Sequence, residues 1–120
     1  MSTPEPESRA DVAGRISDEI ATIHRESYGE SLEAIETHIL DDLVVCMLDI
    51  RLLPHERTLL EHERGEDSIR RVRKEFQESI GATFAATVEH MTGRRVIGFV
   101  SDTHLDPPFS VEIFKLSPAA

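Results

Sequence analysis

The sequence predicts an α+β fold, a two-layer sandwich of helices packed on a four-stranded antiparallel sheet made of two hairpins. Two observations predict it. Apolar residues recur every three or four positions over 10–28 and 69–91, a spacing typical of amphipathic helices. Two pairs of short segments rich in β-branched residues flank turn sequences, which indicates a hairpin in each half of the chain. The expected element order is αββααββ, without the βαβ unit of nucleotide-binding folds.

The first helix is expected over 10–28 and is expected to end at Gly29, because glycine readily adopts the conformation that terminates many helices. Its apolar stripe consists of Val12, Ile16, Ile20 and Ile23. The preceding residues, 1–9, contain two prolines and show no apolar periodicity. We therefore expect a disordered tail over 1–9 and a single α+β domain over 10–117.

The first hairpin is expected to join "AIETHIL" (34–40) to "LVVCMLDIRL" (43–52) through a two-residue link, Asp41–Asp42. The first segment alternates, with Ile35, Thr37 and Ile39 on one face, so this strand is expected to be half exposed. The second segment is apolar on both faces at its start, which predicts a central strand.

Two helices are expected to follow. Pro54 suits the first turn of a short, charged helix that Gly65 interrupts. The long helix after it, of about six turns, ends near Gly93. Gly81 within it predicts a close approach of a neighbouring element, because a glycine leaves room that any side chain would fill. The expected apolar stripe is Ile69, Val72, Phe76, Ile80, Phe84, Val88 and Met91.

The second hairpin is expected to join "RRVIGFVSD" (94–102) to "FSVEIFKL" (109–116). The link is then "THLDPP" (103–108). Because Pro107 and Pro108 cannot donate to a strand ladder, we expect strand pairing to resume only after them.

Composition excludes several function classes. The chain has 120 residues, 13 basic against 23 acidic, and a formal charge of −10, which repels nucleic-acid phosphates and anionic membrane surfaces. Cys46, the only cysteine, lies in an apolar run and is expected to be a core residue in a reducing compartment. No signal peptide and no apolar run of about 20 residues occur, so we expect a soluble, cytoplasmic protein.

Asp102, His104 and Asp106 lie within five residues and form the sharpest polar cluster. Asp side chains often bond to backbone N–H groups two residues on, so turn chemistry is one interpretation. The others are a ligand or contact loop, and a metal or proton-transfer site. A metal needs more ligands converging from elsewhere in the fold, and spacing alone assigns none. No metal site is therefore predicted.

The basic cluster of the chain is expected on the long helix and is the second candidate, a patch for an anion or a protein partner. The alternative is a solvated helix face in which nearby glutamates supply ion pairs. The cluster consists of Arg70, Arg71, Arg73 and Lys74.

Signs of catalysis are missing from the sequence. After His55–Glu56, position 59 is Leu, so the second histidine of a zinc-protease motif is absent. There is no G-x-S-x-G, no phosphate-binding glycine loop and no G-x-G-x-x-G. We therefore expect a protein that is not an enzyme, with no catalytic residues and no cofactor.

Three blocks carry a family resemblance: "VAGRISDEIATIHRESYG", "LDDLVVCMLDIRLLPHERTLLE" and "VEHMTGRRVIGFVSDTHLDPPFSVEIFKL". Together they resemble the MpsC-like family, named for the C component of a Na+-translocating, membrane-potential-generating system and formerly a domain of unknown function. The resemblance implies association with a membrane system for cation-linked uptake of inorganic carbon. It transfers no catalytic residue, but it makes the segment from Asp102 a family motif.

These inferences lead to an expected function and to one alternative. We expect a soluble, non-enzymatic accessory or regulatory module that acts through protein–protein contact. Its expected partners are a second copy of itself and a membrane protein of an ion or bicarbonate uptake system. Nucleic-acid binding and membrane insertion are not expected. The alternative is a domain that senses a small ligand or a metal through the Asp102–Asp106 loop.

Overall fold

The computed structural model describes residues 8–118, which form helices and strands in the expected order αββααββ. Residues 1–7 of the expected tail lie outside the described part. Ser8 caps the first helix by accepting a hydrogen bond from the Asp11 N–H, and Arg9 is the first helical residue. The elements are α1 (Arg9–Tyr28), β1 (Leu32–Leu40), β2 (Leu43–Ile50), α2 (Pro54–Leu60), α3 (Gly65–Thr92), β3 (Val96–Leu105) and β4 (Pro108–Leu116).

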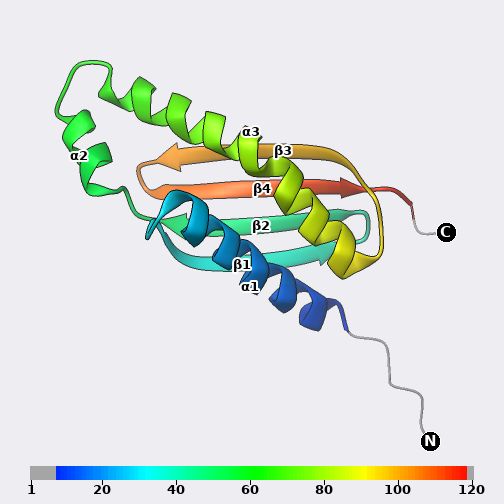
Figure 1. Cartoon of the computed structure of the whole chain (residues 1–120). Helices are drawn as coiled ribbons and strands as arrows, with labels where there is room; N and C mark the ends of the chain where they lie inside the picture. The colour runs from blue at the N-terminus through cyan, green and yellow to red at the C-terminus, as the bar shows by residue number, and fades with distance from the viewer. Residues whose placement is uncertain (1–7, 119–120) are drawn as a thin grey trace, which may run out of the picture.

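The strands form one antiparallel sheet in the order β1-β2-β4-β3. Each hairpin therefore keeps its own pair, and the two hairpins join through β2 and β4. The expected central position of β2 is confirmed. Figure 1 shows α1 and α3 side by side across the same face of the sheet, with α2 beyond one end of it. No described element covers the opposite face.

The two hairpin links differ in how well the sequence predicted them. Asp41–Asp42 forms the expected two-residue turn, with Asp41 at a φ of 51°. The expected six-residue link in the second hairpin is wrong. There β3 continues to Leu105, and Leu105 pairs with Pro108, the first residue of β4. Proline is tolerated at the first position of a strand, so the ladder starts at a proline instead of after it.

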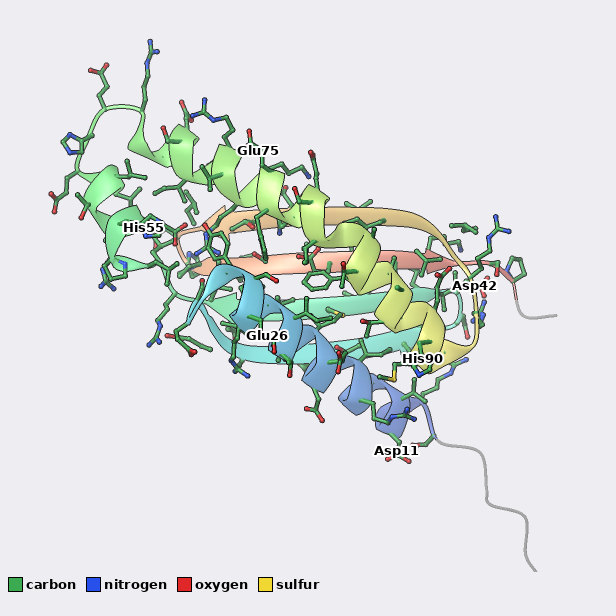
Figure 2. All side chains as sticks on the ribbon, in the orientation of Figure 1. Asp11, Glu26, Asp42, His55, Glu75 and His90 are labelled. Atoms are coloured by element: carbon green, nitrogen blue, oxygen red, sulfur yellow. The ribbon has the colours of Figure 1, made fainter. Side chains whose placement is uncertain are left out.

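The core lies between the two long helices and the sheet, where Figure 2 shows side chains from both layers. Its largest fully buried side chains include Phe84 of α3, Phe114 of β4 and Leu48 of β2. Cys46 lies among them with no exposed area, as expected, and burial raises the pKa of its thiol to about 12. Such a thiol stays protonated and unreactive at neutral pH.

The helix α3 is unbroken over its 28 residues, and its expected apolar stripe is buried or half-buried except at Val72. Val72 is 47% exposed, whereas Arg73 and Gln77 are buried. The expected stripe contained only apolar residues. The N-terminal half of α3 also packs against polar groups of α2 and the sheet, so Arg73 and Gln77 are buried there as their hydrogen-bond partners. The buried residues of α3 are Gly65, Ile69, Arg73, Gln77, Gly81, Phe84 and Val88.

Gly81 marks the expected close approach. A Cβ built at this position lies 2.7 Å from Cε2 of Phe99 on β3, closer than real Cβ contacts come. The Phe99 ring in turn packs against Phe114, with 5.1 Å between ring centroids. The glycine therefore brings α3 onto β3 and sets the height of the helix above the edge of the sheet.

Candidate functional site

The basic cluster of α3 lies where the helix crosses the free edge of β3. Lys74 Nζ donates a hydrogen bond to the Ser101 carbonyl oxygen at 2.6 Å, and Arg70 Nη1 donates to the Thr103 carbonyl oxygen at 3.4 Å. Both carbonyls belong to an edge strand, which has no neighbour on that side. Capping them with charged side chains is one way in which proteins protect a sheet edge from pairing with another strand.

Arg73 points into the molecule and forms a buried ion pair with Glu56 of α2. Its Nε and Nη2 donate to the two carboxylate oxygens at 2.7 and 2.6 Å, and the side chains are 3% and 2% exposed. Burial opposes ionisation of Glu56, but the bonds from Arg73 and from the Leu53 N–H outweigh it and lower the pKa of the carboxyl. The pair is therefore charged at neutral pH and fixes α2 against α3.

The same guanidinium reaches α1 and the turn before β1. It lies over the Tyr28 ring, 4.6 Å from the centroid, and Nη2 donates to Ser31 Oγ at 2.9 Å. Tyr28 donates its hydroxyl proton to Glu56 Oε2 at 3.0 Å. Nearby, burial and then the Arg73 charge lower the pKa of His24 to about 4, so this histidine is neutral in the fold. Arg73 thus has a structural role.

The structure separates the four residues of the predicted basic patch. Arg73 faces the interior, Lys74 and Arg70 bond to the edge of β3, and Arg70 also pairs with Glu66 Oε1 at 2.7 Å. Arg71 is exposed on the helix. They do not share one surface, so the predicted anion or partner patch reduces to the exposed Arg70 and its neighbours.

A second buried polar cluster lies under α3, next to the first. Glu112 of β4 is 1% exposed, accepts a bond from Gln77 Nε2 at 3.3 Å, and faces Ser101 across the β3–β4 ladder. Burial raises the pKa of the Glu112 carboxyl to about 7, although Ser101 and Gln77 beside it act in the opposite direction. Its second oxygen has no hydrogen-bond partner among the described residues, so the cluster favours a protonated carboxyl.

Asp102, His104 and Asp106 lie at the outer end of the second hairpin and are exposed. Asp102 and His104 belong to β3, and Asp106 belongs to the turn. Asp102 Oδ1 accepts a bond from the Thr103 N–H at 2.9 Å, and His104 Nδ1 lies 2.8 Å from the Pro107 carbonyl oxygen. These local bonds are those of turn and strand-end chemistry.

Arg70 brings the two predicted candidates together. Shallow depressions of about 320 and 270 Å³ lie on either side of Arg70 and His104, at the corner where α3 meets the end of β3. We call this corner the Arg70–His104 surface. It consists of Glu66, Arg70, Asp102, His104 and Asp106. Within residues 8–118, no group of three or more His, Cys, Asp or Glu side chains could hold a metal ion.

The comparisons with known proteins add one finding. The model of the family described as "Na+-translocating membrane potential-generating system (MpsC)" matches residues 8–118. The chain belongs to the MpsC family. Membership implies a role in a Na+-translocating, membrane-potential-generating system. No curated protein and no solved structure matches the chain. None of the helices of this MpsC-family chain within the described residues is long and apolar enough to cross a membrane.

Sequence reasoning missed the two buried carboxylates of this MpsC-family chain. Glu112 had a usable signal, because the period of a strand places it on the same face as Phe114 and Leu116, which a surface glutamate would not share. Glu56 had none, since its partner lies 17 residues away on another helix.

Proposed function

We propose that this MpsC-family chain is a non-catalytic accessory component of a Na+-translocating system and works through protein–protein contact. Its partner is a membrane protein of that system, of the kind that takes up an ion or bicarbonate. The chain meets it from the cytoplasm through the Arg70–His104 surface. Family membership supports the system, and the geometry of this surface supports the contact.

The observation that carries the proposal is that this surface is exposed and yet held in place. Arg70 is anchored by Glu66 and by the Thr103 carbonyl, and the His104 ring packs 5.1 Å from the Phe109 ring. Side chains that are already ordered lose less entropy when a partner binds. Charges of both signs on one corner select a partner of complementary pattern and reject others.

A co-sedimentation experiment tests the proposal. The full chain is mixed with lipid vesicles that carry the membrane components of the system, and with empty vesicles of the same lipid. We expect the chain to sediment only with the loaded vesicles, and Arg70→Glu to weaken binding about tenfold or more, since truncating a charged interface contact costs 2 kcal/mol or more.

Arg71→Glu is the matched control, because it makes the same charge change one residue along the same helix at an exposed position. It should bind like the unchanged chain, and both variants should keep the melting temperature within a few degrees. Equal weakening by both variants would show that only net charge matters. Failure of the unchanged chain to bind loaded vesicles would reject the proposal.

A second function, sensing of a small ligand, is favoured by the depressions beside Arg70 and His104. Their volumes suit a small anion rather than a larger metabolite, and a guanidinium and an imidazole are donors that an anion needs. Thermal melting with added bicarbonate, inorganic phosphate or Zn2+ separates the ligand classes. A rise with one anion that Arg70→Glu abolishes would support sensing, and no rise with any of them would dismiss it.

A further inference from the structure

The face of the sheet that the helices leave uncovered is apolar. On β2 and β4 the even-numbered residues are buried under the helices, so the odd-numbered ones point to the opposite side. On β3 the phase reverses, and Val100 points outward with 60% of its surface exposed. We call this side the open face, whose apolar centre consists of Val45, Met47, Val100, Val111 and Ile113.

The strand registers make this centre continuous. Val45 lies opposite Ile113, and Ile113 lies opposite Val100, so one row crosses β2, β4 and β3. In the next row Met47, 45% exposed, lies opposite Val111. Monomeric soluble proteins rarely expose contiguous apolar patches larger than a few hundred Å², and larger ones mark interaction sites.

We infer that the open face is a homodimer interface, on which a second copy of this chain packs sheet against sheet. The size of the face fits this occupant. Four strands about 4.8 Å apart, nine residues long at about 3.3 Å each, present a flat area of about 570 Å². Two such flat faces together bury about 1,100 Å², close to the lower limit of about 1,200 Å² for stable interfaces. Side chains that protrude from the sheets add to this buried area.

The polar side chains on the open face also fit a second copy, because a carboxylate accepts the hydrogen bond that an imidazole N–H donates. Glu36 of β1 lies level with Met47, and His38 lies level with Val45 in the adjacent row, 3.2 Å from Glu36 of the same copy. A two-fold axis that crosses the strands between these rows sets Glu36 of each copy opposite His38 of the other, and the Lys115 end opposite the Asp49 end. An axis along the strands instead sets Glu36 opposite Asp102, which repels. Both arrangements pair the face with itself, and complementarity selects the first because it avoids the contact between Glu36 and Asp102.

This interface overlaps the partner contact proposed above at Asp102 and His104, which point outward from β3. Arg70 and Glu66 of α3 belong to the partner contact alone, whereas the dimer is centred on β2 and β4. If the dimer inference fails, the chain is monomeric in solution. If the proposed function fails, the chain does not bind loaded vesicles.

The test is the mass of the full chain in solution, measured by light scattering after size exclusion and by sedimentation at micromolar concentration. We expect a dimer, and Met47→Glu should raise its dissociation constant by about 100-fold or more, because it buries an unpaired charge from each copy. Val72→Glu is the matched control, since Val72 is 47% exposed on α3 against 45% for Met47. It should leave the dimer unchanged.

The orientation has its own test. Glu36→Lys should weaken the dimer by removing the carboxylate that accepts from His38 of the other copy, and Glu36→Lys combined with His38→Glu should restore a donor–acceptor pair and the dimer. An unchanged chain that is monomeric at micromolar concentration overturns the inference, and so does equal loss of the dimer with Met47→Glu and Val72→Glu. A monomer that binds loaded vesicles through Met47 would assign the open face to the membrane partner instead, and would also overturn it.

Discussion

Replacing Glu112 by Gln tests the buried cluster under α3 through the pH dependence of stability. The variant keeps the shape of the side chain and its contact with Gln77, but it cannot ionise. Burial raises the pKa of Glu112 from 4.5 to about 7 in the folded chain. Because the folded value lies above the unfolded one, the stabilising contribution is full below about 4.5 and is lost as pH rises through about 7.

The size of the effect follows from the same values. A difference of about 2.5 pKa units, at about 1.36 kcal/mol per unit, means that ionisation of Glu112 costs the folded state about 3 kcal/mol at pH 8. Glu112→Gln escapes this cost. Part of this cost is already present at pH 5, so relative to the unchanged chain the variant should gain about 2.5 kcal/mol in free energy of unfolding between pH 5 and pH 8.

Urea unfolding at both pH values, followed by circular dichroism, measures this gain. The pH dependence of His24 is shared by the two proteins and cancels in the comparison. Glu26→Gln, which removes an exposed carboxyl from α1, is the matched control and should show a gain of less than about 0.5 kcal/mol. If Glu112→Gln differs from the unchanged chain equally at pH 5 and pH 8, the assignment of a raised pKa is refuted.

Three further predictions concern stability and are read by urea unfolding. Arg73→Met should cost about 3–5 kcal/mol by leaving Glu56 buried without its cation, and adding Glu56→Gln should recover most of it; no recovery would contradict the ion pair. His24 is neutral with a pKa of about 4 against 6.5 unfolded, so stability should fall by about 3 kcal/mol as pH drops from 6.5 to 4, a loss absent in His24→Leu. Gly81→Ala should cost about 1–3 kcal/mol by pushing the β3 ring away, whereas Gly14→Ala, with open space around it, should gain up to about 1 kcal/mol; equal effects would argue against the close approach.

The order of elements and the pairing within each hairpin could be predicted because they follow from local patterns. The stripe that includes Phe84 and Val88 has the helical period, and the Asp41–Asp42 turn separates two apolar runs. The position of β4 beside β2 could not be read from the sequence, since joining two hairpins depends on contacts between distant segments.

The errors share one physical cause, which is that apolar periodicity does not register buried polar pairs. Arg73 was expected to be exposed, in a partner patch or on a solvated face, and is buried because Glu56 meets it there, while Val72 takes the exposed position. For the same reason, the apolar pattern did not predict that Glu112 is buried. The expected link between β3 and β4 was longer than the observed one, because Pro108 was taken to prevent strand pairing. A proline lacks only the N–H, so Pro108 still pairs with Leu105.

The candidate site was predicted in its parts but not in its assembly. Asp102, His104 and Asp106 were chosen from one segment and Arg70 from another, and nothing in the sequence indicated that α3 places them on one corner. That juxtaposition depends on the crossing of α3 over the edge of β3, which Gly81 permits.

Hydrogen–deuterium exchange of the full chain with vesicles carrying the membrane components of the Na+-translocating system tests the central claim most directly. The account predicts slower exchange over 102–110 and over 66–71 when the loaded vesicles are added, with no change for empty vesicles of the same lipid. Unchanged exchange in both segments, together with protection elsewhere or nowhere, would contradict the claim that this corner of α3 and β3 meets the partner.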